Sequence, residues 1–128
     1  QLVAHLVDKG GTMRDFTSSS EAALYLWDYF YLSNVPTAAE AKPWRYIENA
    51  TFRIRESEQI MHHEDYPAAM RVRHAKRVRR AIRKILRCVD ELETVPASWT
   101  AEVLAFFEVS AERLIEELGE EAARAPLH

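Results

Sequence analysis

The chain has 128 residues, the size of one domain, which is long enough to bury roughly two thirds of the surface that it exposes when unfolded. Apolar residues make up 48% and charged residues 29%, with only three Gly against five Pro and a net charge of −3, so the composition excludes a disordered tail and favours helix. No apolar run approaches the roughly 20 residues that cross a bilayer, and the start lacks the pattern of a secretion signal, so we expect no membrane association and a cytoplasmic location.

The first predicted element is a short amphipathic segment over residues 1–12, which ends with the Gly10-Gly11 link. It places Leu2, Val3, Leu6 and Val7 on one face of a helix. Two interpretations stay open. The segment is either a short first helix of the natural chain, or, with Met13 as the natural start, a vector-derived extension or a tethered partner peptide. Under both interpretations we predict a single helical-bundle domain over residues 13–128.

Two longer helices are predicted next, and a sequence with capping-box spacing precedes each of them. The sequence SSSE at residues 18–21 has the spacing of a capping box and precedes AALYLWDYFYLSN. TAAE at residues 37–40 repeats that spacing before a helical pattern that runs to about His63. Alternatively, Pro43 interrupts this pattern, and the second helix then begins at Trp44.

Two further helices complete the expected bundle. Asp65 and Pro67 open one that runs to about Glu93, and the turn TVPAS at residues 94–98 precedes the last, from about Trp99 to Ala123. Apolar residues recur at steps of three and four in both helices, at Ala75, Val78, Ile82, Ile85, Val89 and Leu92, and at Leu104, Phe107, Ala111, Leu114 and Leu118. We therefore predict an all-α protein, an antiparallel up-and-down bundle of about four long helices, with a short N-terminal helix as an option.

A basic stretch, RVRHAKRVRRAIRKILR from Arg71 to Arg87, holds nine bases and no acid. Residues 90–128 hold two bases and ten acids, so opposite charges gather on different helices. If the apolar seam faces inward, most cations of the stretch point outward, and only Arg79 stands at an edge suited to pairing with a neighbouring helix. The outward cations are Arg73, Lys76, Arg77, Arg80, Arg83, Lys84 and Arg87, and the acids away from the last seam are Glu108, Glu112, Glu116 and Glu120.

This charged surface suits three kinds of partner: an acidic protein, a second copy of the chain, or a nucleic-acid backbone. The stretch contains no aromatic residue for base stacking and no Asn or Gln for reading adenine. Nucleic-acid binding through it is therefore expected to be non-specific.

An aromatic segment, LYLWDYFYL at residues 24–32, has Asp28 as its only charge. A helix that is apolar nearly all round is either covered on several sides, here by the N-terminal segment, or presents a patch to a partner. The candidate partner-binding residues are Tyr25, Trp27, Tyr29 and Tyr31, because Tyr and Trp supply much of the energy at protein interfaces.

The stretch RESEQIMHHEDY contains the ionisable residues that an active site could use. Its His and Glu residues lack the spacings of di-iron and zincin helices, so we expect no metal site and no cofactor. The stretch resembles the catalytic motif of HEPN-fold ribonucleases, in which an Arg precedes a His on a small helical bundle. That resemblance implies Arg55 as the phosphate ligand and His62 as the acid or base; Glu56 stands where the family has Asn, Asp or His.

No Gly-rich phosphate loop or GxSxG elbow is present, and the single Cys88 lies among apolar residues, which excludes an internal disulfide and predicts a packed, reduced thiol. The sequence thus favours a non-enzymatic interaction module, a small regulator, adaptor or assembly protein that binds a protein partner or itself. Backbone binding to nucleic acid and the HEPN-like ribonuclease remain the alternatives.

Overall fold

The computed structural model describes residues 4–7, 13–28, 37–92 and 97–124, with side chains over 16–28, 37–92 and 102–124. Its elements are β1 (Ala4–Val7), β2 (Met13–Phe16), α1 (Ser19–Leu26), a 3-10 turn (Ala38–Glu40), α2 (Ala41–His62), α3 (Ala68–Val89) and α4 (Ala97–Arg124). The four helices pack against one another, which confirms the predicted all-α bundle. No helix in these ranges is long and apolar enough to span a membrane.

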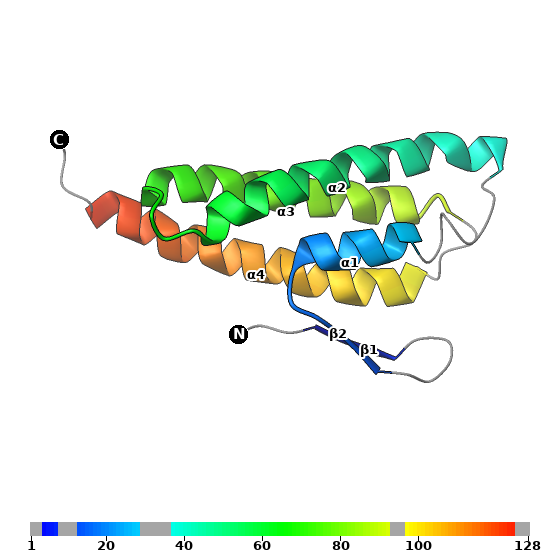
Figure 1. Cartoon of the computed structure of the whole chain (residues 1–128), viewed down its shortest axis with the longest axis horizontal. Helices are drawn as coiled ribbons and strands as arrows, with labels where there is room; N and C mark the ends of the chain where they lie inside the picture. Colours follow the sequence, from blue (N-terminus) through cyan, green and yellow to red (C-terminus); the bar gives the residue numbers. More distant parts are fainter. Residues whose placement is uncertain (1–3, 8–12, 29–36, 93–96, 125–128) are drawn as a thin grey trace.

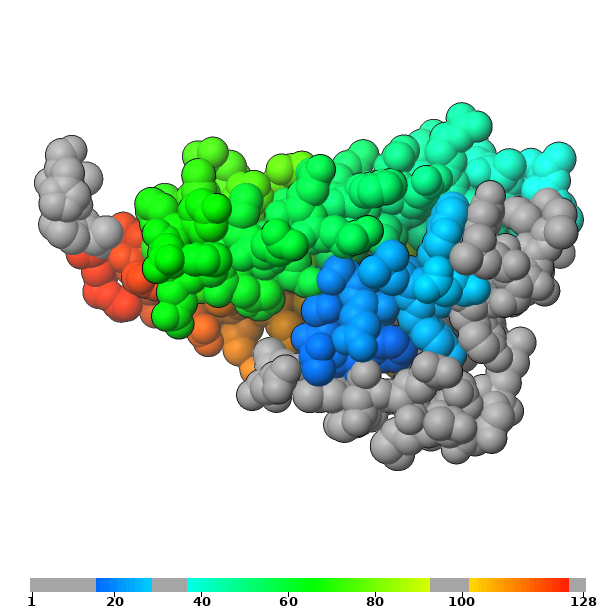
Figure 2. Space-filling view, in the orientation of Figure 1, coloured from blue at the N-terminus to red at the C-terminus, as the bar shows by residue number. Residues whose placement is uncertain are grey.

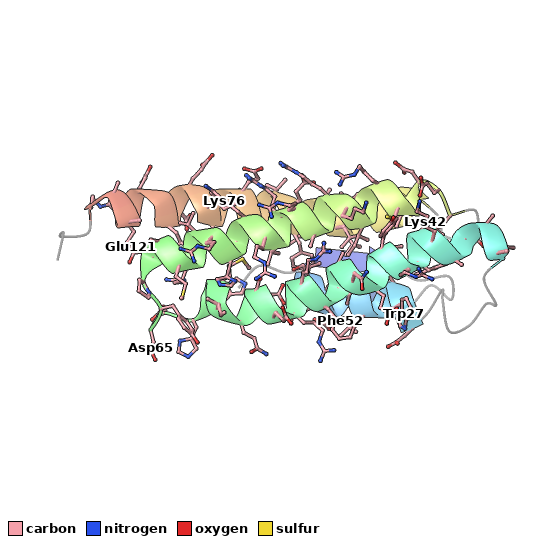
Figure 3. The ribbon with its side chains drawn as sticks, turned by 90° about the horizontal axis from the view of Figure 1, so that it is seen from above. Trp27, Lys42, Phe52, Asp65, Lys76 and Glu121 are labelled. Carbon is pink, nitrogen blue, oxygen red and sulfur yellow. The ribbon has the colours of Figure 1, made fainter. Side chains whose placement is uncertain are left out.

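Each of the four helices packs mainly against two of the others. α3 lies between α2 and α4 and packs along both of them (Figure 3). α1 lies on the opposite side, where it also contacts both α2 and α4 (Figure 1). α1 is only 8 residues long, whereas α2 has 22 and α4 has 28, so α1 covers only part of the channel between its two neighbours.

The beginning of the chain differs from the expected short helix. Ala4–Val7 is a strand that pairs antiparallel with Met13–Phe16, and the hairpin packs beside α1 and α4. A helix of so few residues is marginal in water, whereas pairing with β2 satisfies the backbone groups of both segments. The two interpretations of residues 1–12, a natural first segment or an added one, both stay predictions.

The predicted capping box forms at the start of α1. The Ser18 hydroxyl accepts a hydrogen bond from the Glu21 N–H at 3.2 Å, and the Glu21 carboxylate accepts one from the Thr17 N–H at 3.0 Å, one residue earlier than expected. In α2, Pro43 causes no interruption, because it falls in the first turn, where its missing N–H has no intrahelical partner.

The apolar seams of α3 and α4 form the core, as predicted. The seam residues from Ala75 to Val89 in α3 are at most 2% exposed, and Leu92, beyond the end of α3 at Val89, is 5% exposed. In α4, Leu104, Phe107, Ala111 and Leu118 are buried, and Leu114 is half-buried. Cys88 is buried among them, and burial raises the pKa of its thiol. The thiol is therefore packed, as the sequence predicts.

Candidate functional site

A hollow lies where α1 leaves part of the channel between α2 and α4 unfilled. A cavity of about 560 Å³ begins at the N-terminus of α1 and continues along the uncovered part of both long helices. In Figures 1 and 2, α2 and α4 extend to the left beyond the blue start of α1. We call this cavity the open groove. Its volume falls within the range of about 300 to 1,000 Å³ that ligand pockets occupy.

The open groove has an apolar floor and a polar rim. Val78 of α3 forms the floor, and Met61 of α2 with Phe107 and Leu114 of α4 forms the walls. The rim holds His62 of α2 and Arg113 and Glu117 of α4, which are exposed, and Ser110 of α4, which is half-buried. An apolar trough bordered by charges is suited to the apolar face of an amphipathic partner.

A buried carboxylate closes one end of the open groove. Glu58 of α2 is 8% exposed, and one of its oxygens accepts hydrogen bonds from the N–H groups of Ser19 and Ser20, at 3.0 and 3.4 Å. Both hydroxyls also donate to the carboxylate, that of Ser20 at 2.5 Å. The negative charge therefore sits at the positive end of α1 and attaches α1 to α2.

Sequence reasoning missed Glu58 as a structural residue, although a signal was available. Ile47, Ile54 and Met61 mark the buried face of α2, and Glu58 lies three residues before Met61 and four after Ile54 on the same face. A carboxylate at a core position needs donors from another element, and the backbone amides of a helix start are such donors.

A second buried polar contact joins α2 to α3. Nδ1 of His74 lies 3.1 Å from the hydroxyl of Ser57, which is fully buried. Burial, together with the nearby charges of Arg77 and Arg73, lowers the pKa of His74 from its usual 6.5. The folded protein therefore favours the neutral imidazole.

This shift predicts a pH dependence of stability. The unfolded chain binds a proton at His74 more readily than the folded protein, so the free energy of unfolding should rise with pH up to about 6.5 and level off above it. Urea unfolding at pH 5.5 and 7.5 measures the effect, and His74→Gln should reduce the difference. An equal pH difference in the variant would contradict the prediction.

The basic helix is less exposed than its sequence suggests. Arg79 pairs with Glu112 at 3.0 Å, as expected for its edge position. The expectation that only Arg79 is placed for such pairing is wrong, because Arg83 also reaches Glu108 and Glu112, at 2.6 and 2.7 Å. Long Arg side chains bend sideways along the helix surface to reach acids on a neighbour.

Two more of the predicted cations lean towards α2. Arg77 lies 4.0 Å from Glu56, and the Lys84 ammonium stands 4.3 Å from the centroid of the Tyr46 ring. Arg73, Lys76, Arg80 and Arg87 are exposed and form no ion pair with any residue that the structure describes. The structure therefore divides the predicted charged surface into an internally paired set and an outward set.

The aromatic candidates lie at the junction of α1 with its neighbours. Tyr25 stacks edge-on against Phe16 of β2 at a centroid distance of 5.4 Å, and Trp27 does so against Trp44 of α2 at 5.8 Å. Both are half-buried, and these two ring partners belong to β2 and α2, so cover by residues 1–12 stays a prediction. Tyr29 and Tyr31 lie outside the described residues.

The two residues implied by the ribonuclease resemblance line different hollows. His62 lies at the rim of the open groove, whereas Arg55 lines a separate cavity of about 110 Å³ beside Trp27 and Phe52. The structure therefore does not bring their side chains together at one site. Within the described part of the chain, no three His, Cys, Asp or Glu side chains are grouped to hold a metal ion.

Comparison with known proteins adds no further constraint on the site. A scan of protein-family models finds no match for this chain, and searches among curated proteins and solved structures find none either.

Proposed function

We propose that the protein is a non-enzymatic, cytoplasmic interaction module that binds an amphipathic helix of a protein partner in the open groove. The observation that carries this proposal is the shortness of α1. Among the residues that the structure describes, none fills the fourth position of the bundle beyond the N-terminal end of α1, above the apolar floor at Val78. A helix laid against α2 and α4 completes the packing that the other helices already make.

The dimensions of the open groove define the length of the bound helix. At 1.5 Å per residue, α2 is about 33 Å long and α1 about 12 Å. The residues of α4 that line the groove run from Phe107 to Glu117, which corresponds to about 15 Å. The bound helix therefore has about three turns.

The lining defines the chemistry of the bound helix. The apolar side chains of Met61, Phe107 and Leu114 favour a partner helix with apolar residues at i, i+3 or i+4, and i+7, which lie on one face of a helix. Arg113 and Glu117 border the groove and favour an acid and a base of the partner on the flanks. The buried apolar contacts supply the affinity, and these rim charges supply the orientation.

Two substitutions of adjacent residues on α4 test this function. Ser110 lines the open groove, whereas Val109 points outward and is 57% exposed. We expect Ser110→Trp to fill the groove and weaken helix binding by at least about tenfold, and Val109→Trp to leave it unchanged. The probe is a displayed library of amphipathic helices of about three turns, selected on the wild-type protein and measured by fluorescence anisotropy.

The selection has clear contrary outcomes. Peptides that bind the Ser110→Trp variant as tightly as the wild type would place the binding surface elsewhere. A small apolar molecule that copurifies with the wild type but not with Ser110→Trp, seen by native mass spectrometry, would make the groove a ligand pocket instead.

A further inference from the structure

The outer surface shared by α3 and α4 presents two parallel ridges of opposite charge. On α3, Lys76 and Arg87 are exposed, and Lys76 lies on the side that borders α4 (Figure 3). On α4, Glu102 and Glu116 are exposed. None of these four forms an ion pair within the residues that the structure describes. We call this surface the charged face.

Ion pairs inside the molecule set the register of the two ridges. Arg79 pairs with Glu112, and four residues further along α3 Arg83 pairs with Glu108, four residues earlier on α4. The helices are therefore antiparallel and level at these points. If this register is extended along both helices, Lys76 and Glu116 lie within one residue of the same position along the bundle axis. Arg87 and Glu102 lie within two residues of the same position.

This register makes the charged face complementary to itself. We propose that it binds a second copy of the chain, related by a two-fold axis that runs parallel to the helices between α3 and α4. Rotation about such an axis leaves the position of every residue along the axis unchanged, and it places α3 of one copy against α4 of the other. Lys76 then faces Glu116 of the second copy, Arg87 faces its Glu102, and each pair occurs twice.

A second copy suits this face better than a phosphate backbone does. The carboxylates of Glu108 and Glu112 lie between the ridges, and the acids of α4 stand directly beside the cations of α3. A polyanion that touches the cations also approaches these acids, whereas a second copy offers Glu116 to Lys76 and Glu102 to Arg87. Val109, 57% exposed on α4, is covered in the same dimer.

The dimer is expected to be weak and dependent on salt. Exposed ion pairs each contribute at most about 1 kcal/mol, and added salt screens them. The open groove faces α1 and α2, and its rim borders the charged face at Arg113, one helical turn from Val109 and Glu116; its apolar lining, from Met61 to Leu114, lies outside the charged face in both copies. This proposal is thus independent of the proposed function.

Charge reversal at one predicted pair tests the dimer. In sedimentation velocity at about 50 mM salt, Lys76→Glu and Glu116→Lys should each weaken self-association by at least about tenfold, because each dimer then contains two like-charge pairs. An equimolar mixture of the two variants should restore it, because both pairs between unlike copies again join an acid to a base. Arg53→Glu and Glu48→Lys, exposed positions on α2, are the matched controls and should leave the dimer intact.

Three results would overturn the proposal. The first is a wild-type protein that stays monomeric at low salt and high concentration. The second is a dimer that both variants leave unchanged, or that their mixture fails to restore. The third is a monomer that binds labelled RNA or DNA duplex and loses that binding on Lys76→Glu, which would assign the cations to a nucleic-acid backbone.

Discussion

Replacing Ile82 by Asp is expected to leave the chain unfolded. Ile82 is fully buried in the seam of α3, the helix that packs on both α2 and α4. Removing only its apolar atoms, as in Ile82→Ala, costs about 2 to 5 kcal/mol, and Asp adds the cost of an unpaired buried charge. Domains of this size are stable by only about 5 to 15 kcal/mol, so the combined loss consumes most of that stability.

Circular dichroism and urea unfolding measure this effect. Arg80→Asp is the matched control, because Arg80 lies two residues earlier on α3 and is exposed without an ion pair to any described residue. We expect the control to stay folded, with a change within about 1 kcal/mol. A folded Ile82→Asp protein would show that the α3 seam is not the centre of the core.

The second large effect is expected at Glu58. Glu58→Ala should lower the free energy of unfolding by about 2 to 4 kcal/mol, because two N–H groups and two hydroxyls at the start of α1 lose their common acceptor. α1 is short and depends on this attachment to α2. Its amides should therefore lose protection from hydrogen exchange before those of α3.

Glu56→Ala is the matched control for Glu58→Ala. Glu56 lies two residues earlier on α2, and its one ion pair with a described residue is an exposed contact of 4.0 Å with Arg77, so its loss should cost less than about 1 kcal/mol. Glu58→Gln keeps the shape and an acceptor oxygen but removes the charge at the helix start, and we expect an intermediate cost. Equal stability of the Glu58 and Glu56 variants would contradict the attachment of α1 through Glu58.

Most of the bundle could be predicted because its long helices have regular apolar periodicity. The seam of α3 recurs at steps of three and four, and the burial of every seam residue from Ala75 to Leu92 confirms it. The start of α2 at Ala41 and the end of α4 at Arg124 lie within a few residues of the expected positions. Such patterns are local, so they can be read without knowing the neighbours.

The N-terminal hairpin could not be predicted in the same way. Four residues in each strand are too few to show alternation, and the partner of Ala4–Val7 lies beyond the Gly10-Gly11 link. The open groove was missed for a related reason. It depends on where α1 lies between α2 and α4, and no periodicity within one helix contains that information.

For the charged residues too, part of the arrangement follows from the sequence and part only from the tertiary structure. The sequence alone shows nine bases in residues 71–87, and the helical period alone predicts that most of them point away from the core. Which of them remain available was decided by the neighbouring helices, since Glu108 and Glu112 of α4 pair with Arg83, and Glu56 of α2 pairs with Arg77. The reach of a long side chain to a neighbouring helix is a tertiary property.

By itself, then, the sequence determined the all-α class, the two main seams, the packed Cys88 and the separation of charge, because each follows from residue type and spacing along one helix. The tertiary structure alone decided that Glu58 attaches α1, that the open groove remains beside it, and that the ridges of the charged face stand in register. Those features arise between residues far apart in the chain, where the packing of one element sets the surroundings of another.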